Sequence, residues 1–282
     1  MLTLGTRLLQ DGRIITAKHK PIISWPGGKS RLARHILPLF PAHRCYVEPF
    51  CGGLGMFLSR EVPTGGTVEV INDFNGDLVN LFRVVKYHKD AFLAELDLNL
   101  NSREEFRTFM AQPGLTDIQR AARWFMRRKN CFSGDERSFP AARTRPLSSM
   151  QAKLEQIRML AARLDSVAVE HLDYRECLRR YDSAATLFFV DPPYAQDGGN
   201  DYKGWKAEQT AELADLLSGL KGQWVLTLDD SEANRKLFAR CEQTSLVRTC
   251  SANNTSSTPK DFGELIVCSR AMEQHQNSLN VA

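Results

Sequence analysis

The chain has 282 residues, of which 43% are hydrophobic and 25% are charged, and its formal net charge is +4. This composition is typical of a globular protein with one large domain and an appended lobe. Charged residues interrupt the apolar positions near the amino terminus, unlike a secretory signal, and no segment approaches the roughly 18 consecutive apolar residues of a transmembrane helix. We therefore expect a cytoplasmic protein that has no membrane partner.

The seven cysteines are odd in number, scattered along the chain, and show neither Cys-x-x-Cys spacing nor a Cys/His metal pattern. We expect them to be reduced and mostly structural, in a protein that binds no metal.

Strands and helices alternate in the first part of the chain. Residues 30–40 have apolar side chains at helical spacing, which predicts a helix with Ser30 as its N-cap. Residues 45–47 form a short predicted strand that enters a glycine-rich turn, and a further helix is expected from about Leu54. Residues 67–71 form the next predicted strand, and the helix after it has four apolar residues on one face: Leu78, Leu81, Phe82 and Val85. This order favours a parallel, doubly wound sheet.

From about residue 89 to residue 165 the pattern changes to polar helices, which we interpret as an inserted, mainly helical lobe. Strand patterns then resume at Val167–Glu170, Thr186–Val190, 223–228 and 265–268, with helices expected at Ala207–Ser218 and 231–239. The predicted fold class is therefore α/β, with a Rossmann-like, doubly wound sheet and an inserted lobe.

The tetrapeptide Asp191-Pro192-Pro193-Tyr194 directly follows an apolar strand, and ligands of open α/β sheets bind outside the carboxyl ends of strands. One reaction that this tetrapeptide suits is methyl transfer to the exocyclic N6 of adenine. Adenine N6 is a poor nucleophile because its lone pair is delocalised into the ring. If Asp191 and the carbonyl of Pro192 each accept one N6 hydrogen, the lone pair points at an electrophilic methyl group. Tyr194 offers a flat face for stacking on a base rotated out of the duplex. The alternative is a rigid turn, and the position at a strand end favours the catalytic interpretation.

A second turn, within residues 46–55, is rich in glycine, which allows a ligand close to the backbone, although a tight strand-to-helix connection uses glycine in the same way. The next strand ends at Asp73, about 20 residues on, where an acidic side chain can bind ribose hydroxyls. The Gly-Lys-Ser ending at residues 28–30 lacks the earlier glycine of a P-loop, because Ile23 or Ser24 occupies that place. We therefore reject an NTPase.

Basic residues are concentrated in one stretch, at Arg120, Arg123, Arg127, Arg128, Lys129, Arg137, Arg143 and Arg145. Taken alone, this pattern is typical of a solvated helix face.

Four motifs occur in order along the chain, at residues 24–32, 46–58, 70–78 and 191–194. Together they resemble the DNA adenine methylase (Dam-like) family, and the match covers most of the chain. The resemblance implies a class I methyltransferase fold, S-adenosyl-L-methionine as cofactor, and site-specific methyl transfer to N6 of adenine in double-stranded DNA by base flipping. We expect a monomeric bacterial or phage-encoded enzyme, either independent or beside a partner restriction endonuclease.

In that family the Trp-x-Gly-Gly-Lys and glycine-rich motifs contact the cofactor, which implies cofactor roles for Trp25, Lys29, Glu48, Phe50 and Gly52. Lys29 is suited to pair with the methionine carboxylate, and Trp25 or Phe50 to lie near the cationic sulfonium.

Acidic residues complete the implied cofactor site. Asp73 matches the family's ribose-binding acid. Asp191 of the catalytic motif is also expected to contact the cofactor. Asp173 resembles the later acid that reaches the cofactor adenine, and its alternative role is the N-cap of a helix at residues 174–180.

The resemblance also divides the chain. Residues 1–88 and 166–282 are the two parts of the catalytic domain, and residues 89–165 are the inserted target-recognition lobe. There the basic residues are expected to contact DNA phosphates or guanine edges, two roles that only a complex separates. The expected DNA-binding set is Arg123, Arg127, Arg128, Lys129, Arg137, Arg143 and Arg145. Ser24 stands where the family commonly has lysine, and the segment after Phe132 departs from GATC methylases, so the target sequence stays open.

Two other functions are weighed against this one. RNA adenine methylases share the tetrapeptide, but the early Trp-Pro-Gly-Gly-Lys motif and the basic insert fit the DNA family better. A catalytically silent DNA-binding protein on the same fold is disfavoured by the intact Asp-Pro-Pro-Tyr. Cofactor-dependent methyl incorporation separates these functions.

Overall fold

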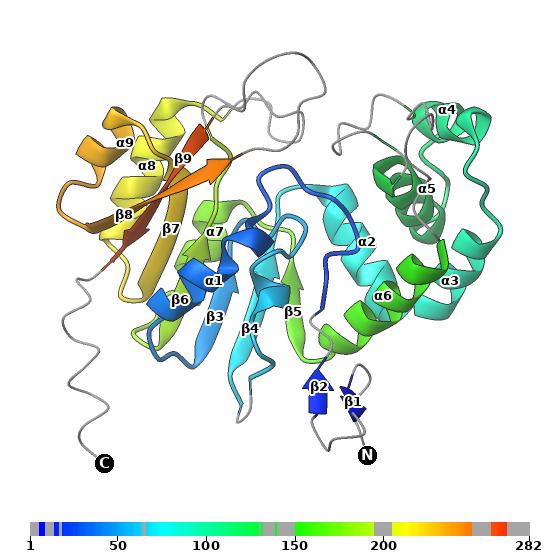
Figure 1. Ribbon diagram of the computed structural model, residues 1–282, viewed down its shortest axis with the longest axis horizontal. Coiled ribbons are helices and arrows are strands. Elements are labelled where there is room, and N and C mark those ends of the chain that lie inside the picture. Colours follow the sequence, from blue (N-terminus) through cyan, green and yellow to red (C-terminus); the bar gives the residue numbers. More distant parts are fainter. Residues whose placement is uncertain are drawn as a thin grey trace. The chain divides into compact units, whose positions relative to one another are not determined.

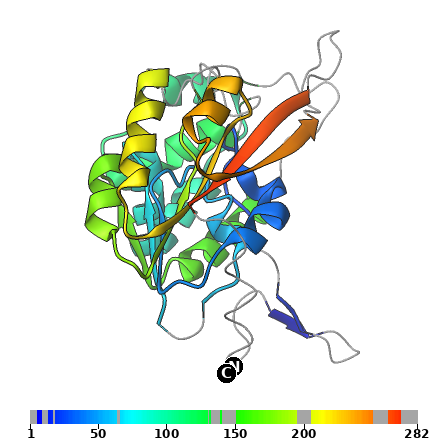
Figure 2. The same cartoon turned by 90° about the vertical axis from the view of Figure 1, so that its left-hand side faces the viewer.

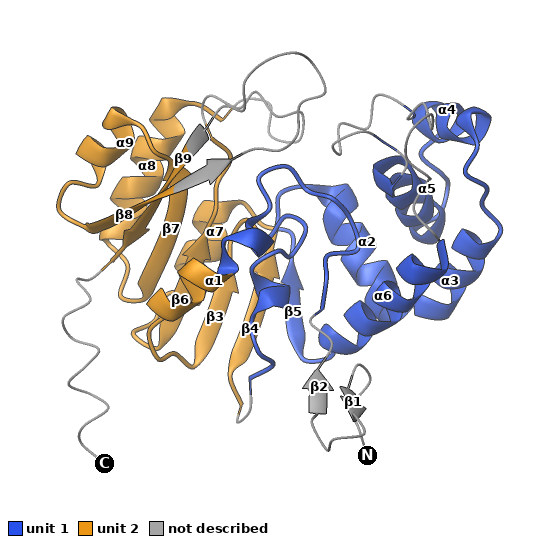
Figure 3. Ribbon diagram, viewed as in Figure 1, with its two compact units in different colours: residues 1–33, 51–64, 73–171 blue, residues 34–50, 65–72, 172–282 orange. Residues whose placement is uncertain are grey.

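The computed structural model describes residues 6–8, 14–16, 19–63, 66–129, 131, 139, 150–194, 205–249 and 261–269 (Figure 1). The chain forms two compact units, which are coloured separately in Figure 3. Unit 1 comprises residues 1–33, 51–64 and 73–171, and unit 2 comprises residues 34–50, 65–72 and 172–282. Each unit therefore contains segments that are far apart in the sequence.

A seven-stranded sheet has the order β5-β4-β3-β6-β7-β9-β8. Its strands are β3 (Cys45–Glu48), β4 (Val68–Asn72), β5 (Val167–Glu170), β6 (Thr186–Val190), β7 (Gln223–Asp229), β8 (Glu242–Thr249) and β9 (Asp261–Cys268). Strand β3 pairs in parallel with β4 and β6, and β6 pairs in parallel with β7. Strand β9 runs antiparallel to both β7 and β8. The predicted α/β fold with a mostly parallel, doubly wound sheet is confirmed.

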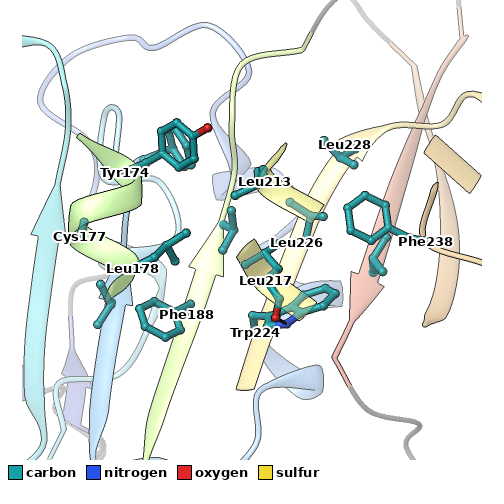
Figure 4. Close-up of a cluster of buried hydrophobic side chains, with 14 of the residues drawn as sticks. Tyr174, Cys177, Leu178, Phe188, Leu213, Leu217, Trp224, Leu226, Leu228 and Phe238 are labelled. Atoms are coloured by element: carbon teal, nitrogen blue, oxygen red, sulfur yellow. Dashed lines mark hydrogen bonds between the residues drawn. The ribbon is translucent and has the colours of Figure 1, made fainter. Parts of the chain in front are cut away.

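The core of unit 2 lies between the sheet and helices α7 (Tyr174–Tyr181) and α8 (Ala207–Ser218). Because successive side chains of a strand point to opposite faces, Phe188 and Val190 of β6 face these helices together with Leu226 and Leu228 of β7. Figure 4 shows Leu213 of α8 among these side chains. Strand β6 is buried along its whole length, as expected for a central parallel strand.

Unit 1 contains α2 (Gly76–Tyr87), α3 (Lys89–Asp97), α4 (Arg103–Ala111), α5 (Asp117–Lys129) and α6 (Met150–Arg163). Local sequence explains where two of them begin. The side chain of Asn75 accepts a hydrogen bond from Leu78 N, and that of Ser102 accepts from Glu104 N and Glu105 N. Helix α5 packs against α2, α3 and α4, and α6 packs against α2 and α3.

Two helix predictions near the amino terminus are wrong. In place of one helix at residues 30–40 the chain forms a 3-10 turn at Lys29–Arg31, a short helix α1 at Ala33–Ile36, and a second 3-10 turn at Leu37–Leu39. Pro38 explains the break, because it lacks the N–H that a continuous helix requires. Ser30 lies inside the first turn and is not an N-cap.

The helix expected from about Leu54 is likewise only a 3-10 turn, Phe57–Ser59. The physical reason is backbone conformation, since Gly52 has φ +45° and Leu54 has φ +64°, both in the left-handed region. A right-handed helix cannot include them.

The pattern also failed to predict three strands: β1 (Thr6–Leu8), β2 (Ile14–Thr16) and β8. Strand β8 has few apolar residues because it lies at the edge of the sheet, where Figure 2 shows it beside β9. Within the described residues, no helix is long and apolar enough to span a membrane.

Candidate functional site

The strand order of the sheet reverses at β3. From β3 the chain moves to β4 and then β5 on one side, and it returns to the other side of β3 with β6. Ligands of open α/β sheets bind outside the carboxyl ends of the strands at such a reversal. Glu48 ends β3, and Asp191 directly follows β6. The topology therefore places both acidic residues where a ligand is expected.

Polar side chains from four strands of unit 2 share the face of the sheet opposite the α7–α8 core. Val47, Val190, Leu228 and Leu265 belong to that core, so alternation turns the residues next to them to the other face. Those residues are Glu48 of β3, Asp191 after β6, Thr227 of β7 and Glu264 of β9. This end of the sheet thus has one apolar face and one face with three carboxylates.

Asp191 is held by a hydrogen bond from β7. The hydroxyl of Thr227 donates to Oδ1 of Asp191 over 2.7 Å, and the hydroxyl of Tyr194 lies 3.5 Å from the same oxygen. Thr227 is completely buried, and Pro192 is buried beside the half-buried Asp191. The carboxylate of Asp191, which the sequence predicts to be catalytic, therefore has a fixed orientation.

Tyr194 donates its hydroxyl to Oε1 of Glu264 on β9. Burial, followed by the carboxylates of Asp191 and Glu264, raises the pKa of Tyr194 well above its ordinary value. The hydroxyl therefore remains protonated and acts as a donor. Neither Thr227 nor Glu264 is among the site residues predicted from the sequence. The available signal was a single carboxylate at the start of the apolar run Glu264-Leu265-Ile266-Val267.

Asn72, the last residue of β4, links three backbone segments of unit 2. Its Nδ2 donates to the carbonyls of Pro49 (2.8 Å) and Leu172 (3.1 Å), and its Oδ1 accepts from Leu172 N (2.8 Å). Asn72 is buried. The backbone segments that carry Glu48 and Asp173 are thereby fixed to each other. From the sequence, Asn72 was predicted only to lie at the end of a strand.

Glu48 and Phe50, both predicted cofactor residues, are buried in unit 2. Glu48 accepts a hydrogen bond of 2.6 Å from the hydroxyl of Tyr46. Phe50 belongs to an aromatic group, with its ring centroid 5.2 Å from that of Tyr174 and 5.6 Å from that of Trp205. The ring of Phe50 thus has a packing role, and its cofactor role stays a prediction.

Asp173 is the N-cap of α7, because its Oδ1 accepts a hydrogen bond of 2.9 Å from Arg175 N. Its carboxylate also pairs with the guanidinium of Arg175, which in turn pairs with Glu212 of α8. Of the two roles weighed for Asp173, the N-cap is present in the structure, and contact with a cofactor stays a prediction.

The glycine-rich turn of unit 1 packs directly against the segment that carries Trp25. A Cβ atom at Gly52 would lie 2.6 Å from Nε1 of Trp25, and one at Gly53 would lie 2.9 Å from Cβ of Trp25. At Gly55 a Cβ atom would lie 3.0 Å from Oγ of Ser30. These glycines therefore bring the Trp-Pro-Gly-Gly-Lys segment into contact with the turn.

Asp73 fixes the same turn. It is completely buried; its Oδ2 accepts from Gly52 N and its Oδ1 from Asn75 N, each over 2.9 Å. Lys29, also buried, donates from Nζ to the carbonyl of Gly27 over 2.9 Å. Four predicted cofactor residues, Trp25, Lys29, Gly52 and Asp73, therefore lie in one local assembly of unit 1.

The basic residues of α5 divide between two faces of the helix. Arg123 and Arg127, four residues apart, lie on one face, where Arg123 donates to Gln112 O over 2.8 Å and Arg127 contacts the sulfur of Met110. Lys129 donates to Asn101 Oδ1 over 2.9 Å, and burial lowers its pKa. These three side chains are half-buried, so they combine contacts within unit 1 with partial exposure.

Arg128 is on the other face of α5 and is only 2% exposed. Its guanidinium carbon lies 4.5 Å from the ring centroid of Trp25 and 4.9 Å from that of Trp124. In this conformation Arg128 packs inside unit 1, and its contact with DNA stays a prediction. Arg137, Arg143 and Arg145 lie outside the described residues.

Comparison with known proteins identifies the family of the chain. Residues 25–249 match the family model of the D12 class N6 adenine-specific DNA methyltransferases. The DNA adenine methylase of Escherichia coli K12 is 24% identical over 271 residues, which cover 88% of this chain and 95% of the relative. That of Serratia marcescens is 28% identical over 196 residues, 63% of this chain and 68% of the relative.

A third relative is more similar over a shorter segment. The DNA adenine methylase of Haemophilus influenzae is 37% identical over 79 residues, which cover 28% of this chain and about a quarter (26%) of that relative. The family model covers well over half of the chain. The chain therefore belongs to the D12 class of N6 adenine-specific DNA methyltransferases.

Proposed function

We propose that the chain binds S-adenosyl-L-methionine and double-stranded DNA, rotates a target adenine out of the helix, and catalyses direct methyl transfer to its N6. The observation that carries the proposal is the position of Asp191, whose carboxylate is fixed by Thr227 at the carboxyl end of a buried strand, where the strand order reverses.

Asp191 and Pro192 are the residues that act on the amino group. The carboxylate of Asp191 and the carbonyl of Pro192 each accept one hydrogen of N6, which localises the lone pair on the nitrogen instead of leaving it delocalised into the ring. When bound, the cofactor would supply the methyl group for in-line transfer to N6, with its sulfur as the leaving group, and the proton that N6 loses would pass to Asp191 or to solvent. A fixed acceptor pair reduces the reorganisation required in the transition state.

Tyr194 is proposed to stack on the rotated base. Loss of stacking and pairing costs a few kcal/mol, and an aromatic face in the pocket offsets part of that cost. The hydrogen bond from the Tyr194 hydroxyl to Glu264 restricts rotation of the ring. The ring therefore needs little further ordering when a base arrives.

The residues present suit S-adenosyl-L-methionine by their chemistry. The cofactor supplies an electrophilic methyl group on a sulfonium, which requires positioning rather than a Lewis acid. Lys29 offers a cation for its carboxylate, Asp73 and Asp173 offer acceptors for its hydroxyl and amino groups, and Trp25 offers π density for its cationic centre. The glycine-rich turn keeps backbone N–H groups near any ligand that it binds.

The helices of residues 89–165 are proposed to form the target-recognition lobe. Support comes from the half-buried basic residues Arg123, Arg127 and Lys129 of α5, which lead into the arginine-rich segment of residues 130–149. Phosphate contacts of this kind position a protein on DNA, and base contacts select the sequence.

The test is transfer of a radiolabelled methyl group from the cofactor to duplex DNA. Asp191→Ala is expected to lower the single-turnover rate at least a hundredfold, in line with loss of a principal transition-state contact. Asp215→Ala changes an exposed aspartate on α8 and serves as the matched control. Equal rates for the two variants would remove Asp191 from the mechanism, and transfer to RNA but not to DNA would contradict the proposed substrate.

A further inference from the structure

We propose that Thr227 and Glu264 are positioning residues of the methyl-transfer site: Thr227 sets the orientation of the Asp191 carboxylate, and Glu264 sets that of the Tyr194 ring. The inference rests on the proposed function, which assigns Asp191 and Tyr194 their roles.

Thr227 fixes the plane of the carboxylate. Its completely buried hydroxyl donates to Oδ1 of Asp191 over 2.7 Å, a normal length for such a bond. The direction of the lone pairs on both carboxylate oxygens depends on that plane. An error of a few tenths of an ångström at an acceptor is enough to weaken a hydrogen bond to N6.

Glu264 is a carboxylate at the start of the apolar run of β9, residues 265–268, and it is 4% exposed. Burial of a charge is costly unless strong donors compensate for it. One donor is the hydroxyl of Tyr194, which stays protonated because its pKa is raised. This hydrogen bond attaches the hydroxyl end of the tyrosine ring to β9, and the backbone holds the other end. The ring is therefore fixed at both its ends.

The sheet, rather than a loop, brings these groups together. Asp229 of β7 is directly opposite Glu264 of β9, and Thr227 lies two residues before Asp229, so Thr227 and Glu264 share one face. Residues on paired strands are held more precisely than residues on loops. The antiparallel strand β9 thus adds a catalytic support that the parallel strands alone do not provide.

The two supports are adjacent. The hydroxyl of Tyr194, whose proton is donated to Glu264, lies 3.5 Å from the Asp191 oxygen that accepts from Thr227. Because Glu264 and Tyr194 share a hydrogen bond, changes at these two residues should be energetically coupled, whereas independent sites would give additive effects.

The first experiment measures single-turnover methyl transfer, together with dissociation constants for cofactor and DNA. Thr227→Val replaces the hydroxyl with a methyl of nearly equal size and is expected to lower the rate at least tenfold with both dissociation constants within about twofold of the parent. Thr227→Ser keeps the hydroxyl and should recover most of the loss. Thr244→Val, at an exposed threonine of β8, is the matched control. Parental rates for Thr227→Val would overturn the role of Thr227.

The second experiment is a double-mutant cycle. Glu264→Leu and Tyr194→Phe should each lower the rate at least tenfold, and the double variant should fall no more than about twofold below the slower single variant. Glu264→Gln keeps an acceptor oxygen and should stay within about threefold of the parent. Rate losses that multiply in the double variant, or a Gln variant as slow as the Leu variant, would overturn the role of Glu264.

Two features keep the outcomes distinct. Tyr194→Phe removes the same hydrogen bond without changing Glu264, so a parental rate for this variant overturns the proposal even where Glu264→Leu does not fold. If the unmodified chain transfers no methyl group, the proposed function fails. If it transfers the methyl group and the Thr227 and Glu264 variants match it, only the present inference fails.

Discussion

The guanidinium of Arg128 is stacked on the ring of Trp25, with its carbon 4.5 Å from the ring centroid, and Trp124 contacts it from 4.9 Å. Trp25 itself rests on Gly52, whose N–H is bound by Asp73. A continuous series of contacts therefore joins helix α5 to the glycine-rich turn within unit 1. The final residues of that helix are basic residues that the sequence predicts to bind DNA.

We expect Arg128→Met to behave as a cofactor-site variant. Loss of a buried cation–π contact should lower the free energy of unfolding by roughly 1–3 kcal/mol and weaken S-adenosyl-L-methionine binding, because Trp25 loses its support. Arg128→Lys should recover little, since an ammonium cannot stack in the same way. Urea denaturation and calorimetry provide the measurements. If instead the salt dependence of DNA binding becomes shallower, Arg128 contacts a phosphate after all.

Replacement of Asn72 is expected to lower folding stability. Asn72→Ala leaves the buried carbonyl of Pro49 and the part-buried carbonyl of Leu172 without this donor and should cost roughly 1–3 kcal/mol of folding stability. Asn72→Asp cannot donate either and adds a buried charge, so it should be the less stable of the two. Urea melts of the pair give the ranking, and an aspartate variant as stable as the parent would show that the link is not needed.

Asp73→Asn separates two roles of one carboxylate. The amide retains a single acceptor atom, so it cannot accept from both Gly52 N and Asn75 N, and the turn should loosen. Cofactor affinity should then fall more than DNA affinity. Unchanged affinity for the cofactor, measured by calorimetry on a folded variant, would restrict Asp73 to a structural role.

The basic residues that lead out of α5 predict a salt effect. Neutralising Arg143 and Arg145 together should weaken DNA binding and reduce its log–log salt slope by roughly one unit for each lost phosphate contact, with cofactor affinity unchanged. A base-reading arginine would instead relax sequence preference at one position and cost about 1–3 kcal/mol there. Arg179→Gln, at an exposed site on α7, is the control. If neither quantity changes, recognition depends on other residues.

Much of the fold was predictable because strong local patterns agreed with the tertiary structure. The run Thr186–Val190 was apolar throughout, as a strand buried on both faces must be, and Ala207–Ser218 had helical spacing between a polar start and Gly219. The pattern failed at Leu54, where the left-handed backbone depends on tertiary contacts that no local propensity reveals.

The candidate site was predictable where one motif carries its chemistry, and not where distant residues meet. Asp191 and Tyr194 lie in one tetrapeptide, but Glu264 is 70 residues beyond Tyr194 and reaches it only through the pairing of β7 with β9. Arg128 shows that neighbouring residues can also be hard to distinguish from the sequence. It follows Arg127 in a basic run, and only the phase of the helix turns one toward Trp25 and the other away.

This chain is proposed to transfer a methyl group to N6 of adenine in DNA through Asp191. The decisive experiment is mass spectrometry of the nucleosides released from duplex DNA after incubation with the chain and S-adenosyl-L-methionine. We expect N6-methyldeoxyadenosine with the unmodified chain and at least a hundredfold less with Asp191→Ala. Methylation of cytosine alone, or equal amounts of N6-methyldeoxyadenosine from both proteins, would contradict it.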